Sequence, residues 1–379
     1  MRFIKKSKIY LIVIIILIII LLLVGTCWGI WSYQNRDVVR INNKEFTSMI
    51  KKTIGKSDEE KLMKEDLILV TEVTIKDMSQ MKYLDRFPNL KSVILNDVDF
   101  TIEELMEGGY LNQIEIMDWW DCNVNGNNSE MDLPNLQEIR ITNSLLSDCN
   151  NIYKKLVNLT KFVFYDNLPE VEDYINAVYI FDIEDLCENT ELNSILIDCG
   201  YKNAEQLAKF SRLKKLDLDF KSDIDFDYKI FSQLSQLEEL WCCNITQENF
   251  DLVCNMANLK KLYLNFNNNK KLNWSNITKL NQLEDLSVDY VTQEEFDVIC
   301  NLVNIKWIFL YFSYNNANKV VNLSNISKLT EIEGIHIEFV YGSDPKNEMS
   351  FVNYEGVYKL EYLTSTYIDN YIEKKYPNY

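Results

Sequence analysis

The sequence repeats itself at a distance of 46 residues. Residues 245–262 read ITQENFDLVCNMANLKKL, and residues 291–308 read VTQEEFDVICNLVNIKWI. The segments before them also match, with FSQLSQLEEL at 231–240 and ITKLNQLEDL at 277–286. A fixed period of this length is typical of repeat proteins, in which each unit buries its apolar side against its neighbours. We therefore expect a stack of similar units that share one continuous core.

Each period of 46 residues contains two shorter units of about 22 and 24 residues, which open with L-x-x-L-x-L. The last three positions alternate, which places their apolar side chains on one side of a short strand. The segment after the strand has helical spacing, because Phe250, Val253 and Cys254 fall on one face. Thr246 or Gln247 is the expected start of that helix. The units open at Leu90, Leu111, Leu136, Leu159, Leu192, Leu213, Leu237, Leu259, Leu283, Ile305 and Ile332.

A strand followed by a short helix within 20–29 residues resembles the leucine-rich repeat. Residues 37–75 also resemble the N-terminal cap of internalin-like surface proteins of bacteria. There a short helix that ends near Gly55 precedes the segment KEDL and a first strand at 70–75. The likeness covers residues 37–340. It implies an α/β leucine-rich-repeat solenoid, with a parallel sheet on the concave face and short helices on the convex face.

The sequence departs from the internalin-like pattern at two points. Repeats of that family carry an asparagine nine residues in, whose side chain bonds buried backbone, and here only Asn167 and Asn267 hold that place. Less regular stacking is therefore expected. The family's wall-sorting tail is also missing after residue 340. Attachment to the cell surface would then depend on the N-terminal segment.

That N-terminal segment predicts a membrane anchor. Residues 9–24 are an unbroken apolar run that continues through residue 31, and a helix of this length reaches about 34 Å, enough to cross a bilayer core. Four basic residues precede the run, so we expect a single-pass protein of the cell membrane with a cytoplasmic N-terminus and extracytoplasmic repeats. Two alternatives stay open: a lipoprotein lipidated at Cys27, and a cleaved signal peptide.

The sequence divides into five expected parts. Glycine and proline are scarce, with 10 and 5 in 379 residues, so long disordered linkers are not expected between them. The parts are a basic cytoplasmic tail at 1–8, a transmembrane signal-anchor at 9–31, a linker with a helical cap at 32–66, leucine-rich repeats at 67–340 and a C-terminal cap at 341–379.

Residues that suggest catalysis or metal binding are few. His336 is the one histidine, so a histidine-based metal site or a Cys–His pair would need unusual partners. It lies between Ile335 and Ile337 and is expected to be exposed on the outer side of a strand. The sequence has no phosphate-binding glycine loop and no G-x-S-x-G segment. We therefore predict a protein that is not an enzyme and has no metal or cofactor.

The nine cysteines allow two states, because an extracytoplasmic location permits disulfides. Cys254 and Cys300 lie at matching positions of the repeat on the apolar side of the helical segment, so we expect buried free thiols there. A bridge between Cys199 and Cys243 stays open, because sequence does not fix a Cα distance.

The charge of the chain limits its partners. The formal net charge is −18, and the expected extracytoplasmic part is more acidic still, because four of the 39 basic residues precede the apolar run. Such a surface repels nucleic acid and anionic lipid, and it suits a cationic partner or solubility alone. The acids from Asp217 to Asp227 lack the glycine and bidentate glutamate of a calcium loop, so a solvated acidic edge is expected.

The outward residues of the predicted strands indicate a binding surface. In L-x-x-L-x-L the residue between the last two apolar positions, and the residue after them, face the concave side. In the later repeats these positions become aromatic, and clustered exposed aromatics mark binding surfaces more often than scattered ones do. Packing against neighbouring side chains is the alternative. The candidate binding residues are Trp241, Tyr263, Phe309, Tyr311, Asp217, Asp219, Asp289 and Glu338.

These observations favour a membrane-tethered extracytoplasmic binding module. Its expected partner is a protein or an extended peptide, and the acidic charge of the chain suits a basic one. The membrane is contacted through residues 9–31. One alternative is an acidic protein that neutralises a basic secreted protein. Others are an envelope enzyme, for which the sequence offers no catalytic constellation, and a glycan-binding protein.

Overall fold

A computed structural model gives the structure of this protein. It describes residues 24, 26, 37–127, 129–149, 151–165, 180–218, 228–243, 245–265, 272–313, 320–340, 350–360, 362–363 and 365–368. The chain divides into two compact units, Met1–Val93 and Ile94–Tyr379.

The first unit begins with the helix that the sequence predicts. Its start is capped by Asn43, whose side chain accepts a hydrogen bond from the backbone N–H of Phe46 at 2.9 Å. After the helix the chain turns at Gly55, which has a φ of +76° that a residue with a side chain would disfavour. The buried face carries Phe46 and Ile50, and Phe46 stacks on Tyr83 with 5.7 Å between ring centroids. The elements are α2 (Lys44–Thr53), the 3-10 helix η1 (Lys64–Leu69), β1 (Glu72–Ile75) and the 3-10 helix η2 (Met78–Arg86).

The segment KEDL has a structural role in this unit. Asp66 is buried and accepts hydrogen bonds from the backbone N–H of Met63 at 2.6 Å and from the ammonium of Lys56. Lys56 follows directly after the turn at Gly55. A buried carboxylate is stable only when it is paired and hydrogen-bonded, so Asp66 ties the end of α2 to the start of η1.

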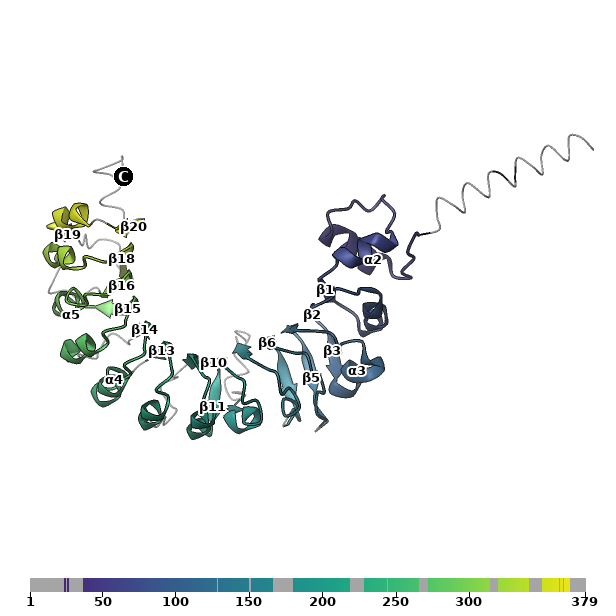
Figure 1. The fold of residues 1–379 in the computed structure, drawn as a ribbon, viewed down its shortest axis with the longest axis horizontal. Helices are drawn as coiled ribbons and strands as arrows, with labels where there is room; N and C mark the ends of the chain where they lie inside the picture. The colour runs from purple at the N-terminus through teal and green to yellow at the C-terminus, as the bar shows by residue number, and fades with distance from the viewer. Residues whose placement is uncertain are drawn as a thin grey trace, which may run out of the picture. The chain divides into compact units, whose positions relative to one another are not determined.

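The second unit contains a long parallel sheet with one strand from each repeat. Figure 1 shows its later strands side by side in chain order, with α4 and α5 on one side of them. Among the described residues of this unit the strands follow in the order β4 (Ile116–Trp120), β6 (Glu138–Thr142), β8 (Lys161–Tyr165), β10 (Ser194–Asp198), β12 (Lys215–Leu218), β13 (Glu239–Cys243), β14 (Lys261–Asn265), β15 (Asp285–Val291), β16 (Trp307–Ser313), β18 (Gly334–Val340) and β20 (Ser365–Ile368).

The second unit also contains smaller sheets of short strands. Of these, β3, β5 and β7 pair with one another, β9 pairs with β11, and β17 pairs with β19. Their bounds are β3 (Asp99–Thr101), β5 (Asn123–Asn125), β7 (Leu145–Ser147), β9 (Ile180–Asp182), β11 (Gly200–Lys202), β17 (Val320–Asn322) and β19 (Ser350–Val352). Strand β2 (Ser92–Asn96) spans the division between the two units.

The apolar positions of L-x-x-L-x-L form columns that run across the sheet. The strand register aligns one residue from each repeat with its counterpart in the next, and every member of the best column is almost fully buried. Burying a leucine side chain contributes about 1.5–3 kcal/mol, so each strand depends on its neighbours for most of its stability. This column contains Leu216, Leu240, Leu262, Leu286, Ile308 and Ile335.

Short helices follow the strands. The predicted helix after Thr246 is confirmed as α4 (Gln247–Val253), where the threonine side chain accepts from the N–H of Asn249 at 3.3 Å. Its repeat partner α5 (Gln293–Ile299) begins after Thr292, and both helices bury a phenylalanine, Phe250 or Phe296. The remaining helices are α3 (Ile102–Met106) and the 3-10 helices η3 (Glu107–Gly109), η5 (Ile183–Leu186), η6 (Ala204–Lys209), η7 (Tyr228–Gln233), η8 (Trp274–Lys279), η9 (Ser324–Lys328) and η10 (Tyr354–Lys359).

A set of side-chain amides links successive repeats at a place that the sequence analysis missed. The residue just before the first apolar position donates to a backbone carbonyl of the preceding repeat: Asn258 to Ser235 at 2.8 Å, and Asn304 to Asn281 at 2.6 Å. Asn167 and Asn267, on which the expectation of irregular stacking depended, lie outside the described residues. The same bond is made by Asn135, Asn158 and Gln236.

The expected membrane anchor at 9–31 lies outside the described residues, apart from Val24 and Thr26. Among the residues that are described, no helix combines the length and the apolar character needed to span a bilayer.

None of the cysteines that the structure describes is part of a disulfide. Cys254 and Cys300 are 1% and 0% exposed, which confirms the expectation of buried thiols. The bridge that stayed open between Cys199 and Cys243 is not formed.

We predict that Cys254→Ser lowers the free energy of unfolding by roughly 1–3 kcal/mol, because it buries a hydroxyl in an apolar site, and that Cys254→Ala costs less. Cys243→Ser, at a half-buried position, is the matched control and should change stability little. Thermal melts with and without a reducing agent make the measurement. A loss of about ten degrees or more on reduction would contradict free thiols.

Candidate binding surface

The side of the sheet that faces away from the buried columns carries the candidate residues; we call it the open face. Every second residue of each strand points there, and the register arranges these residues in rows across the strands. The central row of the later repeats therefore holds the outward residues that the sequence analysis singled out. It consists of Asp217, Trp241, Tyr263, Ser287, Phe309 and His336 on β12 to β18.

Trp241 and Tyr263 form the first aromatic pair on the open face. Their rings are parallel to within 5°, with centroids 4.0 Å apart, and the ammonium of Lys215 lies over the Trp241 ring at 4.3 Å. The hydroxyl of Tyr263 donates to Asp285 Oδ2 at 3.3 Å. Burial, together with the nearby Asp285 carboxylate, raises the pKa of Tyr263. Both rings are thus held in place before any partner binds.

A second aromatic group lies on β16 and β18. Phe309 is 6.5 Å from Trp307 and 5.8 Å from His336, measured between ring centroids, and Tyr311 is also 5.8 Å from His336. The Trp307 ring occupies the space beside Gly334, where a Cβ atom would lie 2.1 Å from it. Only glycine at that position lets the indole lie flat across β18.

The four predicted aromatic residues do not form one cluster. Strand β15 separates the two groups, because it places Ser287 in register with Tyr263 on one side and Phe309 on the other. The described residues include no ring contact that joins Tyr263 to Phe309. The surface therefore has two aromatic groups with a strip of small and acidic side chains between them.

The predicted acids differ in their surroundings. Glu338 pairs with His336, with 3.0 Å between Oε1 and Nε2. Asp289 is half-buried next to Tyr311 and has no side-chain hydrogen bond or ion pair within the described part of the chain. Burial alone raises the pKa of Asp289. Asp217 is half-buried on β12, and Asp219 lies outside the described residues.

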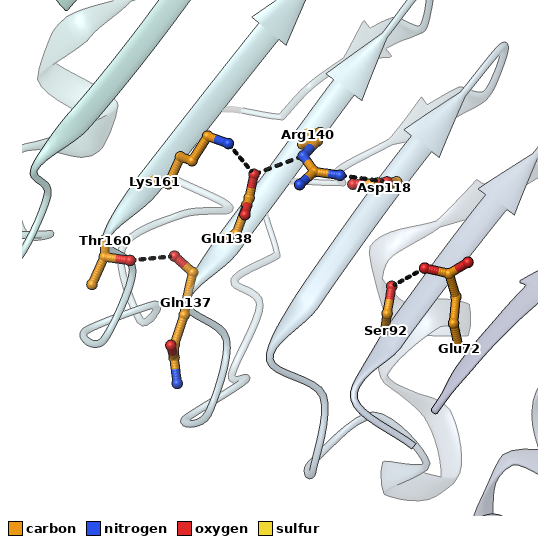
Figure 2. Close-up of polar contacts among 8 residues, drawn as sticks. All are labelled: Glu72, Ser92, Asp118, Gln137, Glu138, Arg140, Thr160 and Lys161. Atoms are coloured by element: carbon orange, nitrogen blue, oxygen red, sulfur yellow. Dashed lines mark hydrogen bonds and ion pairs between the residues drawn. The ribbon is translucent and has the colours of Figure 1, made fainter. Parts of the chain in front are cut away.

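Charged groups on the earlier strands pair with one another. Figure 2 shows Glu138 held by two cations, Arg140 and Lys161, each at 2.6 Å, while Arg140 also reaches Asp118 at 3.1 Å. On the later strands β12 and β13, Lys215 and Glu239 form a similar pair at 2.9 Å. Asp118 and Glu138 of the earlier repeats are thus paired with cations of the same face.

Two members of the surface were missed or misjudged from sequence. His336 is not a freely exposed surface residue, as expected, but is half-buried and contacts two aromatic rings and a carboxylate. Trp307 was not considered, although it lies two residues before Phe309 and so on the same side of β16. The alternation that identified Phe309 and Tyr311 also identifies Trp307 when it is followed one step further back.

Among the described residues, no group of three or more histidine, cysteine, aspartate or glutamate side chains is arranged to hold a metal ion. The face offers flat aromatic rings and carboxylates, which suit the binding of a partner.

We predict that Asp289→Asn raises the melting temperature at neutral pH. The pKa of this carboxyl is raised in the folded state, so its contribution to stability is present below its ordinary pKa of 3.8 and is lost as the pH rises. The gain should therefore shrink as the pH falls toward that value. Melts of both proteins from acid to neutral pH make the measurement.

Glu238→Gln is the control with the opposite sign. Hydrogen bonds from Lys214 and Lys260 lower the pKa of Glu238, so its contribution is present above its ordinary pKa of 4.5 and is lost on acidification. This variant should lose stability at neutral pH. Equal behaviour of the two variants would contradict the assignment of Asp289 as an uncompensated carboxylate.

Comparisons with known proteins give structural likeness only. No protein-family model and no curated protein matches the chain. Among solved structures it is similar to an internalin from Listeria monocytogenes, at 15% identity and a TM-score of 0.49, with 89% of this chain and 97% of the internalin covered. It is also similar to TLR13 in a complex with single-stranded RNA, at 14% identity and a TM-score of 0.39, with 81% and 48% covered.

The plant peptide hormone receptor RGFR1, in complex with RGF2, is similar at 15% identity and a TM-score of 0.39, with 78% of this chain and 49% of the receptor covered. The chain thus spans about half the length of TLR13 and of this receptor. At such identities the fold assignment stands on the geometry of the chain itself: one parallel strand per repeat, a short helix after most strands and aligned leucine columns. This protein has the α/β fold of leucine-rich-repeat proteins.

Proposed function

We propose that this chain is a binding module that recognises a protein or an extended peptide through the later repeats of its open face. The observation that carries the proposal is the pair of aromatic groups on β13 to β18. Both groups face outward. Stacking and a hydrogen bond to Asp285 hold the first group, and in the second group the Trp307 ring fits into the space beside Gly334. Rigid aromatic side chains lose little entropy on contact and contribute most to binding energy at interfaces.

The charge of the surface favours a basic partner. The whole chain has a formal net charge of −18, and Asp289 has no cation beside it within the described residues. Earlier in the sheet, Glu138 is already paired with Arg140 and Lys161. Long-range attraction of a basic partner therefore acts most directly on the later repeats. No specific observation favours the neutraliser, the envelope enzyme or the glycan-binding protein over this function.

We further propose that residues 9–31 tether the module to the cell membrane, with the repeats outside the cell. The support is the sequence itself: an apolar run long enough for a bilayer, preceded by four basic residues and with Trp28 and Trp31 near its C-terminal end. A tethered module with a rigid face would hold its partner close to the membrane.

The binding proposal predicts that Trp241→Ala and Tyr263→Ala each weaken partner binding by about 2 kcal/mol or more. Both side chains point away from the buried columns, so melting temperatures should change little. Tyr165→Ala, which removes a 39% exposed tyrosine from the open face of β8, is the matched control and should bind normally. A pull-down from surface and secreted proteins supplies the partner for the titration. Unchanged binding by both variants, or their unfolding, would show that these rings only pack.

The tethering proposal predicts that protease added to intact, wall-stripped cells removes the repeats and leaves a membrane-bound stub. Immunoblots against the repeats, with a cytoplasmic protein as the control for cell integrity, make the measurement. Repeats that stay intact until lysis would reverse the orientation.

A further inference from the structure

We propose that the strip of β15 between the two aromatic groups receives an arginine side chain of the partner. This inference rests on the proposed function, because it names the group that the binding surface takes. The strip consists of Asp285, Ser287 and Asp289, which alternate with the buried Leu286 and Val288. We call the space over Ser287 the β15 slot.

The walls of the slot are two aromatic rings. Tyr263 and Phe309 are both in register with Ser287, one on each neighbouring strand. Parallel strands lie about 4.8 Å apart, so a group centred over Ser287 would be about 5 Å from each wall, which is within the range of a cation–π contact. Ser287 is half-buried, and its small side chain stands between the two rings in this row. The slot exists because this position carries a serine, whereas the positions on both sides of it carry aromatic rings.

Both walls are held in place by neighbouring side chains. Trp241 stacks on Tyr263 from the β13 side, and Asp285 accepts the tyrosine hydroxyl. The stack runs from strand to strand, so the other face of the Tyr263 ring looks toward β15. On the opposite side, Phe309 is backed by Trp307 and by His336 on β18. The slot therefore needs little rearrangement to receive a ligand, which lowers the cost of binding.

The charges of the slot call for a cation. Asp289 lies two residues along the strand from Ser287, about 7 Å away, and has no ion pair within the described part of the chain. Asp285 lies at the other end, and its Oδ1 is buried without a hydrogen-bond partner there, although Lys261 is beside it in register. Burial raises the pKa of both carboxyls; Lys261 offsets part of this effect at Asp285, whereas no charged group offsets it at Asp289 within the described residues.

Arginine fits this slot better than lysine. Its guanidinium is planar and can stack on both rings at once, while its N–H groups donate to a carboxylate beside the rings. An ammonium is compact and strongly hydrated, and it gains less from two flat walls. Asp289 would then supply the charge-assisted hydrogen bond, and Tyr263 and Phe309 would supply the stacking.

The test uses the full-length chain in a neutral detergent and two fluorescent probes, a hexa-arginine and a hexa-lysine peptide, at physiological salt. Ser287→Phe fills the slot without changing any charge, and Ser287→Ala is its matched control. Asp289→Asn removes the counter-ion, and Glu248→Gln removes an exposed acid from α4 as the control for overall charge. Ser287→Lys places a cation in the slot and serves as a second blocking variant if the phenylalanine disturbs folding. Fluorescence anisotropy gives each affinity, and a melt confirms each fold.

We expect Ser287→Phe, Ser287→Lys and Asp289→Asn to weaken hexa-arginine binding by roughly tenfold or more, and both controls to stay within about twofold. The wild-type chain should bind hexa-lysine several-fold more weakly than hexa-arginine. Wild-type binding by both blocking variants, an equal loss for Asp289→Asn and Glu248→Gln, or equal affinity for the two peptides would each overturn the slot. If the slot variants bind the partner normally while Trp241→Ala does not, the slot fails and the binding surface stands. If none of these variants weakens binding of the partner, both proposals fail.

Discussion

Each repeat of this protein contributes apolar side chains to columns that run across the sheet, and it can bury these side chains only against the repeats on either side. A single strand cannot bury Leu240. This side chain is covered by Leu216 of one neighbouring strand and Leu262 of the other. Parallel pairing keeps these residues in register, and the amides of Asn258 and Asn304 bond the start of each strand to the preceding repeat. The stack thus needs both the apolar spacing and a polar link at every step.

The same pairing determines what the open face can be. Because side chains alternate, fixing one residue of a strand in the core fixes its two neighbours outward, and the register then places outward residues of successive repeats side by side. Trp241 and Tyr263 stack because their strands are paired at that position. Trp307 can spread across β18 because Gly334 offers no side chain there. A binding surface therefore arises from rows and not from any local motif.

Sequence reasoning predicts much of this and fails at identifiable points. Period and alternation were sufficient for the repeats, the α4 helix, the buried thiol of Cys254 and the outward direction of Trp241. They could not show that Ser287 separates the aromatic residues, because the row across strands depends on a register that one strand does not contain. The prediction for His336 used its own strand alone, whereas this side chain is partly buried against Phe309 and Tyr311 on the neighbouring strand β16.

The two copies of the 46-residue period show how such a surface can change while the core does not. At buried positions the copies carry equivalent residues, Leu240 with Leu286 and Leu264 with Leu310. At the outward position between them they differ completely, since Trp241 in the first copy corresponds to Ser287 in the second. The core tolerates only apolar residues of similar size, but an outward residue contacts no column and can vary at little cost to stability. A tryptophan in the second copy would have joined the two aromatic groups into one row; the serine leaves a gap between them with carboxylates at both ends. The gap in the aromatic row of the open face therefore lies within the two segments whose sequences match best.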